Sequence, residues 1–273
     1  MIPAQRTEAI AARLIAAYDR AETLPPITRD TPEFDVDSAY RVLERIEARR
    51  LEAGWRPVGR KIGFTNTTIW PRYGVYQPMW AHIWQHTVHR APDGRATLSL
   101  QGFVQPRIEP EVVFGLGEDI EPSDDPATML RAAAWIAPGF EIVQSHFPDW
   151  KFTAADCTAA FGLHGALVIG APLVLSPANR LAVGALLPDF RLTLCRGDTV
   201  VDRGVGANVL GGPAHALAHL TRVLEGQPWA PPLARDEIVT TGTISDAWPV
   251  KPGETWRSDY GALPLPGLEL RFR

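Results

Sequence analysis

The chain has 273 residues, of which 45% are hydrophobic and 21% charged, and its net charge at pH 7 is −4. This balance is typical of a globular protein with a sizeable core. Lys and Arg are scattered, which argues against a nucleic-acid or acidic-membrane partner. Charges interrupt the N-terminal segment and no apolar run is long enough to cross a bilayer, so we expect neither a secretory signal nor a membrane span.

Only two cysteines are present, Cys157 and Cys195, and no C-x-x-C spacing occurs. The two thiols could pair, but two cysteines do not imply a disulfide framework. A reducing compartment is the simpler assumption, so we expect a cytoplasmic protein.

The first elements in chain order are helices. Apolar residues at helical spacing predict an amphipathic helix over residues 4–21. After a Pro-Pro break, Asp35 or Asp37 can cap a second helix over residues 38–53. We therefore expect residues 1–58 to form an N-terminal helical region.

The helical pattern ends before Gly59, where a short apolar segment predicts a strand that leads into a loop. Residues 65–90 are rich in Trp, Tyr, Pro and Gln and show no clear period. We interpret them as a long aromatic loop, and its part from Trp70 to Trp84 as a cover that excludes water from a pocket. The alternative is that these aromatic side chains are core or oligomer contacts.

Strands dominate the rest of the chain. With 23 Gly and 25 Pro the sequence is rich in turns, which favours a β-rich core over a helical bundle. A hairpin is expected at Gly197-Asp198. We predict an α+β fold in a single catalytic domain, residues 1–273, with its β-rich metal-binding core at 59–273. The predicted strands are 111–116, 165–169, 190–195 and 237–241, and the predicted helices are 127–137 and 213–224.

The clearest local signal for chemistry is the pair Glu109 and Glu111 beside Arg107. On an extended backbone, residues i and i+2 point to the same side, and Pro110 excludes a helix. Two carboxylates this close repel unless a metal, a shared proton or Arg107 neutralises them. An exposed edge with two solvated carboxylates is an equal alternative on spacing alone.

A third carboxylate, Glu141, lies inside an otherwise apolar stretch. Burying an unpaired carboxylate is costly, although a strand edge could expose it. Three carboxylates without a His or Cys cluster favour a hard cation, Mg²⁺, Mn²⁺ or Ca²⁺, over zinc.

Two further residues are candidates for proton transfer. Lys61 lies in an apolar segment between glycines and could act as acid or base, or bind a carboxylate, although a lysine that reaches the surface is the commoner case. His164, also beside a glycine, is more often structural than catalytic. Gly242 could let the backbone approach a ligand, and a plain turn is equally compatible with it.

Five segments in this order resemble the fumarylacetoacetate hydrolase superfamily, nearest to its 2-oxopent-4-enoate hydratases and oxalocrotonate decarboxylases. The resemblance runs from about residue 35 to the end. It implies a mixed β-roll with peripheral helices, a homo-oligomer, and a Mg²⁺ or Mn²⁺ site on Glu109, Glu111 and Glu141. Lys61 matches the lysine near the active site in that branch. We take Lys61 and His164 as candidate catalytic residues, and Gln77, Arg107, Lys151 and Thr243 as candidate substrate-binding residues. The segments are GRKIGFTN, YQPMW, RIEPEVVF, APGFEIVQSHFPDWKFTAAD and VTTGTISDAWPVKPGETW.

The departures from that pattern concern proton handling. At several positions the hydratases carry polar or acidic side chains (Asp, Asn, Ser and one further acidic residue) that this chain replaces. His164 could supply part of the proton handling that these side chains provide. The metal half of the pattern is kept. The positions that depart are Met79, Gln144, Ala160, Phe161 and Leu163.

The resemblance implies a metal-dependent enzyme for a small 2-oxo acid. The ion would chelate the carboxylate and 2-oxo oxygens and stabilise an enolate, with Lys61 binding the carboxylate or moving the C3 proton. We rank a hydratase or decarboxylase first, a C–C hydrolase of acylpyruvates second and an enol–keto tautomerase third. A non-catalytic binding protein or a subunit of a partner enzyme in the same pathway is the alternative class.

Overall fold

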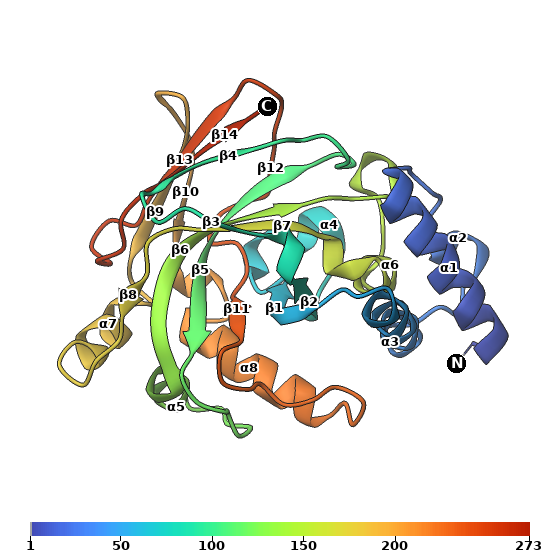
Figure 1. Ribbon diagram of the computed structural model, residues 1–273, viewed down its shortest axis with the longest axis horizontal. Helices are drawn as coiled ribbons and strands as arrows, with labels where there is room; N and C mark the ends of the chain where they lie inside the picture. The colour runs from blue at the N-terminus through green and yellow to red at the C-terminus, as the bar shows by residue number, and fades with distance from the viewer. Residues whose placement is uncertain (1) are drawn as a thin grey trace.

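The computed structural model describes residues 2–273 and contains two β-sheets with helices around them (Figure 1). Within the described residues, the larger sheet has nine strands, seven of them in the order β2-β1-β11-β5-β6-β7-β3, with β12 paired to β5 and β8 to β6. Their bounds are β1 Pro57–Gly63, β2 Met79–Trp84, β3 Val88–Arg90, β5 Arg107–Leu116, β6 Ala133–Val143, β7 His164–Ile169, β8 Leu173–Val174, β11 Ile238–Thr240 and β12 Trp248–Pro249.

The smaller sheet has the order β10-β9-β13-β14-β4 and lies at the upper left of Figure 1, near the C-terminus. The hairpin predicted at Gly197-Asp198 joins β9 to β10, and Gly197 adopts a positive φ of 58° there. The strands are β4 Arg95–Leu98, β9 Arg191–Arg196, β10 Thr199–Val205, β13 Thr255–Asp259 and β14 Leu268–Phe272. The main hydrophobic core contains side chains of both sheets and of α8 (Pro213–Glu225).

The larger sheet curls round on itself. Ile83 of β2 shares one buried cluster with Leu167 and Ile169 of β7, although β2 and β7 are near opposite ends of the strand order. A short 3₁₀ turn, Gln85–Thr87, connects β2 directly to β3 at the other edge. The concave face is therefore enclosed, and an apolar cluster fills part of it.

The two helices predicted over residues 4–21 and 38–53 are present as α1 and α3. Asp35 caps α3 by accepting a hydrogen bond from the amide of Ser38. The α3 helix packs on both α1 and α6, at the right of Figure 1. Among the described residues, no helix is long and apolar enough to cross a membrane. The helices are α1 Ala4–Arg20, α2 Ile27–Asp30, α3 Val36–Glu52, α4 Trp70–Tyr73, α5 Pro126–Ala132, α6 Ala154–Ala159, α7 Arg180–Leu186 and α8.

Two expectations about local structure are wrong in part. The helix predicted over 127–137 ends at Ala132, because residues from Ala133 onward form β6 and pair with β5. The long aromatic loop is shorter than expected, because residues 79–84 form the buried strand β2. Trp80 and Trp84 are thus core residues, which is the alternative stated for them. Cys157 and Cys195 are both free thiols.

Candidate metal centre

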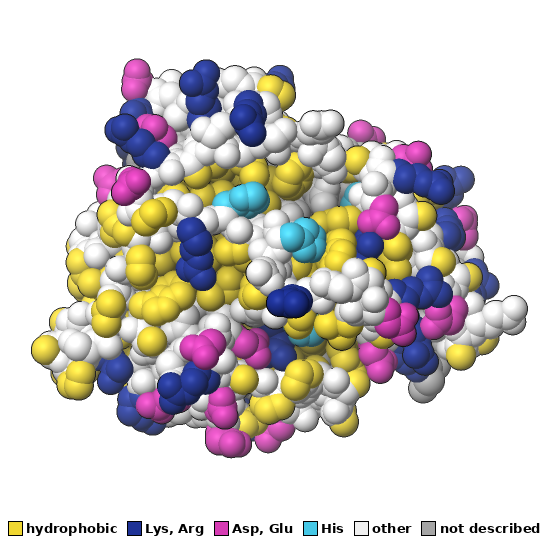
Figure 2. Space-filling model, viewed as in Figure 1, with side chains coloured by type: hydrophobic (Ala, Val, Ile, Leu, Met, Phe, Trp, Pro, Cys, Tyr) yellow, Lys and Arg dark blue, Asp and Glu magenta, His cyan; other side chains and the backbone are white. Residues whose placement is uncertain are grey.

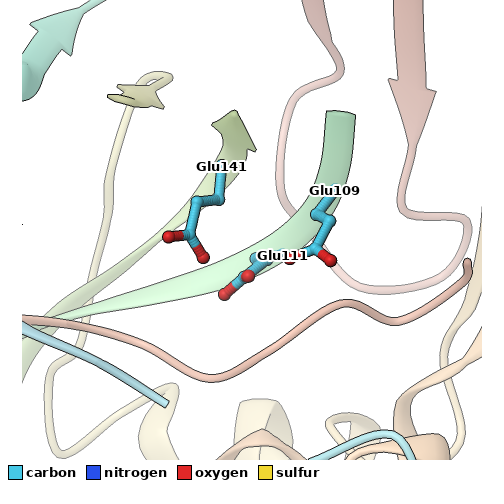
Figure 3. A group of neighbouring side chains, drawn as sticks. All are labelled: Glu109, Glu111 and Glu141. Atoms are coloured by element: carbon cyan, nitrogen blue, oxygen red, sulfur yellow. The ribbon is translucent and has the colours of Figure 1, made fainter. Parts of the chain in front are cut away.

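Three carboxylates converge on the concave side of the larger sheet. Glu109 and Glu111 lie two residues apart on β5, as predicted, and Glu141 stands directly opposite Glu109 in the antiparallel register with β6. One oxygen from each carboxylate lies within 4.8 Å of those from the other two. Figure 3 shows the three side chains pointing toward one another from the two strands. Carboxylate oxygens gathered in this way are suitable ligands for a hard divalent cation.

The surroundings of these carboxylates fit a cation. Glu111 and Glu141 are fully buried, while Glu109 is half-buried. Oε1 of Glu111 is buried and receives no hydrogen bond from the described residues. Since a buried carboxylate oxygen without a partner is costly, a divalent ion among the three groups would satisfy this atom.

The pKa values of the three carboxyls move apart. Burial raises the pKa of Glu109 to about 7, against a partial lowering by Lys61. Burial also raises the pKa of Glu111, and the charges of Glu141 and Glu109 add to that shift. For Glu141, burial is outweighed by Lys61 and by the hydrogen bond to His164, so its pKa is lowered to about 2. A divalent ion would thus displace protons from this cluster.

Lys61 is buried and lies 3.0 Å from Glu141, measured from Nζ to Oε2. It comes from β1, which places its side chain among the three carboxylates. Burial acts to lower the pKa of Lys61, but the charges of Glu141, Glu109 and Glu111 outweigh it and the pKa is raised. The side chain does not reach the surface, so the commoner behaviour of a lysine does not apply to it.

His164 lies behind Glu141. Its Nδ1 is 2.7 Å from Oε1 of Glu141, and its Nε2 is 2.8 Å from Oγ1 of Thr87. The Thr87 hydroxyl also donates to the carbonyl of Trp84 over 2.8 Å. Both ring nitrogens are therefore occupied, and His164 is not among the residues that line the cavity beside the carboxylates.

Two residues from other elements hold Glu111. The amide of Gly242, in the loop after β11, donates to Oε2 of Glu111 over 2.8 Å. Gly242 has a φ of +92°, and a Cβ atom there would lie 1.9 Å from Oγ1 of Thr65. The hydroxyl of Tyr260 donates to the main-chain carbonyl of Glu111 over 2.6 Å. On the sequence alone, Gly242 was equally compatible with a close backbone approach to a ligand and with a plain turn. No sequence signal pointed to Tyr260, which belongs to the segment after β13.

A small inner cavity of about 20 Å³ lies against this centre, and Lys61, Glu109 and Thr243 are among its lining residues. That volume holds roughly one water. Oγ1 of Thr243 is buried and has no hydrogen-bond partner in the described residues. The rest of the lining is mainly apolar or aromatic, including Ile69 and Leu163. A substrate therefore needs side chains at the mouth of this cavity to move.

An outer cavity of about 480 Å³ adjoins the inner one, since Tyr73, Trp150 and Ala247 line both. Arg107 and Lys151 line the outer cavity. The Arg107 guanidinium lies over the Trp150 ring, 4.1 Å from its centroid, and donates to the Tyr73 hydroxyl over 2.6 Å. No separate sequence signal pointed to Tyr73 or Trp150, which lie at the boundary between the inner and outer cavities.

The remaining candidates lie elsewhere. Gln77 is exposed and lines neither cavity. Among the positions that depart from the hydratase pattern, Leu163 lines the inner cavity, whereas the Gln144 side chain accepts a hydrogen bond from the amide of Val104. Met79, Ala160 and Phe161 are buried and line neither cavity. The described lining thus contains no Asp or Asn beside the inner cavity.

Comparison with known proteins decides the family. The fumarylacetoacetate (FAA) hydrolase C-terminal family matches residues 72–264. The chain belongs to the fumarylacetoacetate hydrolase family. A 2-hydroxyhexa-2,4-dienoate hydratase of Comamonas testosteroni is 31% identical over 89% of each chain. A 2-keto-4-pentenoate hydratase of Paraburkholderia xenovorans is 30% identical, over 94% of this chain and 91% of the relative.

Solved structures show the same fold. A 4-oxalocrotonate decarboxylase from Pseudomonas putida G7, complexed with magnesium and adipate, superposes with a TM-score of 0.89 at 22% identity, covering 100% of this chain and 99% of that one. A fumarylpyruvate hydrolase from Pseudomonas aeruginosa, in complex with Mn²⁺ and pyruvate, gives 0.60 at 14% identity over 80% and 89% of the two chains. The α+β fold of this family and the predicted branch are confirmed.

Proposed function

We propose that this member of the fumarylacetoacetate hydrolase family is a lyase that depends on Mg²⁺ or Mn²⁺. Its substrate would be a small 2-oxo or 2-hydroxydienoic acid, and its reaction a hydration or a decarboxylation in the catabolism of aromatic or related compounds. The observation that carries the proposal is the convergence of Glu109, Glu111 and Glu141 within 4.8 Å beside the buried Lys61. The hydratase relatives support the same class of reaction.

The three carboxylates would hold the ion. When bound, the ion supplies positive charge that stabilises negative charge developing on the 2-oxygen of the substrate. His164 keeps the Glu141 carboxylate in place from behind, and the Gly242 amide does the same for Glu111. In this proposal His164 positions Glu141 for the metal and does not touch the substrate.

Lys61 would be the group that handles substrate charge and protons. Its Nζ lies among the carboxylates and at the inner cavity, where it can bind the substrate carboxylate or move the proton at C3. The free hydroxyl of Thr243 would donate to a substrate oxygen at the same cavity. The apolar remainder of the lining excludes water and strengthens these interactions.

The outer cavity favours decarboxylation as the specific reaction. Arg107 has donors left after its bond to Tyr73, and Lys151 is exposed in the same cavity, so a substrate with a second, distal carboxylate would find cations there. Asp149 and Asp246 line this cavity too, and Asp246 pairs with Arg72. Gln77, which is exposed, would contribute to neither end of such a substrate.

The test is turnover of 2-hydroxydienoates, oxalocrotonate and acylpyruvates, followed by ultraviolet absorbance with Mg²⁺, with Mn²⁺ and with chelator. We expect loss of substrate absorbance that requires the metal, and the identified product names the reaction. Turnover of acylpyruvates alone would favour a C–C hydrolase, and loss of the enol absorbance alone a tautomerase. Folded protein that binds metal but turns over no substrate would instead indicate a binding protein or a partner subunit.

Three further parts of the proposal rest on the resemblance and on composition. They are a homo-oligomer, association with a partner enzyme of the same pathway, and a cytoplasmic location. Sedimentation of the purified chain, alone and mixed with candidate partner enzymes, tests the first two. Fractionation of cells that express the chain tests the third.

A further inference from the structure

A second large cavity lies away from the metal centre, between α5, α7 and the start of α8. Its volume is about 460 Å³, within the range of cavities that bind small molecules. The walls are mainly apolar, with Leu130 from α5 and Leu181 from α7 among them. Leu181 is 86% exposed, so a large aliphatic side chain stands at the rim without a partner. Hydrophobic side chains gather at the lower left of Figure 2, where Figure 1 places α7.

The charged groups at this cavity are all of one sign. Arg131 and Arg180 line it, together with the titratable His215, and none of its lining residues is acidic. Arg131 is already partly used, because it donates to Thr128 and lies 4.0 Å from Asp125. Arg180 makes no side-chain hydrogen bond or ion pair with the described residues, and its Nε is buried without a partner. A chain with a net charge of −4 thus presents a local cationic site here.

The start of α8 adds to the same field. Gly212 precedes the helix and supplies no side-chain cap, and Pro213 has no N–H. Ala214 and His215, the next two residues, both line the cavity. A helix N-terminus without a cap favours a negative charge nearby, in addition to the two arginines. The cavity therefore combines an apolar body with a cationic rim.

We propose that this cavity binds an apolar carboxylic acid, with the carboxylate at Arg180 and the apolar body between α5 and α7. The shared chemistry is one negative charge on an aromatic or medium-chain aliphatic body. The apolar walls supply affinity through burial, and Arg180 pairs with the carboxylate. A second copy of this chain, which would cover the cavity with its own apolar surface, is the rival occupant.

The test measures binding of decanoate and of 2-naphthoate to the full chain by titration calorimetry. Chelator is present, so that neither acid can bind through a divalent ion at the carboxylate cluster. We expect saturable binding of at least one acid, and the stronger of the two names the body as aliphatic or aromatic. Decan-1-ol, which lacks the charge, should bind at least about tenfold more weakly than decanoate.

Matched variants locate the site. Arg180→Gln should weaken binding about tenfold or more, and Ala185→Trp should abolish it by filling the cavity from α7. Ala182→Trp, an exposed residue of the same helix that does not line the cavity, should bind as the unchanged protein does. Melting temperatures and Mn²⁺ binding show that each variant is folded.

Two results would overturn the proposal. The first is no binding of either acid, or binding that neither Arg180→Gln nor Ala185→Trp changes. The second is an oligomer that binds neither acid and that Ala185→Trp dissociates. This would assign the cavity to a second copy of the chain.

Discussion

Glu111 shows how one residue depends on the rest of the centre. Its carboxylate is buried, one oxygen takes the Gly242 amide, and the other has no partner in the described residues. The raised pKa of Glu111 means that the folded protein alone does not readily keep this group ionised. A cation with carboxylate ligands would stabilise the ionised form of such a group in a core.

Glu111→Gln should therefore remove most divalent-metal binding. The amide keeps the shape but provides no negative charge, so we expect a loss of metal affinity of at least about tenfold and a loss of turnover of about a hundredfold or more. Calorimetric titration with Mn²⁺ measures the first. Glu118→Gln, at an exposed position, is the matched control and should change neither quantity. Unchanged Mn²⁺ affinity in Glu111→Gln would mean that the cluster is not a metal site.

Lys61→Met should separate catalysis from metal binding. Loss of a positioned acid or base typically lowers the rate by about 10²–10⁴. Because Lys61 offsets the charge of the carboxylates, its removal should leave Mn²⁺ affinity equal or higher. We expect kcat to fall while the Mn²⁺ titration persists. Full activity in the variant would show that Lys61 serves only to neutralise Glu141 before the ion binds.

The sequence could predict the three carboxylates of the candidate metal site but not the partners that hold them. The i, i+2 spacing on a strand places Glu109 and Glu111 together whatever the fold, and a glutamate in an apolar run marks Glu141. The pairing of Lys61 with Glu141 and of His164 with Thr87 depends on strand order, which local pattern does not contain. For this reason the sequence alone favoured a surface position for Lys61 and could not say whether His164 points into a pocket.

At the scale of elements, the loop after β11 brings the backbone of Gly242 to β5. Gly242→Ala should disturb the metal centre without touching a ligand. The added Cβ would overlap Oγ1 of Thr65, and the φ of +92° is unfavourable for alanine. We expect destabilisation of about 1–3 kcal/mol and weaker Mn²⁺ binding. Urea unfolding and a Mn²⁺ titration check it, with Gly253→Ala, also at positive φ but in open space, as the strain-only control.

If Gly242→Ala loses stability but binds Mn²⁺ as tightly as the Gly253→Ala control, the Gly242 amide does not position Glu111. Equal effects of the two variants on both quantities would have the same meaning.

Element boundaries were predictable where local signals agreed. Asp35 and the helical period define α3, and Gly197-Asp198 defines the β9–β10 turn. The helix prediction was wrong after Ala132 because the alanines there are compatible with a helix, while pairing with β5 makes the segment a strand. The loop prediction for the aromatic residues was wrong in the same way. Because β2 is buried on both faces, its sequence shows no alternation of apolar and polar residues. In each case contacts far apart in sequence overrode local preference.

For the whole molecule, the shifted carboxyls predict how stability depends on pH when no divalent ion is bound. The pKa of Glu109 rises from 4.5 to about 7 on folding, and that of Glu111 rises too. The folded state then holds protons that the unfolded chain releases, so this contribution to stability is present below about pH 4.5 and is lost as the pH rises through about 7. Glu141, with its pKa lowered to about 2, stays ionised throughout that interval.

We therefore expect the chelated protein to melt at a lower temperature at pH 8 than at pH 5.5. Each kcal/mol corresponds to roughly 2–4 °C in a protein of about this size. Saturating Mn²⁺ should reverse this trend, because the ion binds the ionised carboxyls and its stabilisation grows with pH. Calorimetric scans at both pH values, with chelator and with Mn²⁺, measure it. The lowered pKa values of His86, His89, His146 and His219 act in the opposite direction over this range. A melting temperature with chelator that is flat or rises would therefore show that the carboxyl shifts are not the larger contribution.

The place of β1 in the larger sheet limits how this protein can be divided. The family match begins at residue 72, so β1 and Lys61 lie outside it. Yet β1 is hydrogen-bonded to β2 on one side and to β11 on the other. A fragment cut to the matched region would keep all three glutamates but lose β1 with Lys61, and it would lose β14 as well. This opens the strand edges of β2 and β11 in the larger sheet and of β13 and β4 in the smaller sheet. We expect it to aggregate, so an expression fragment has to begin upstream of Pro57.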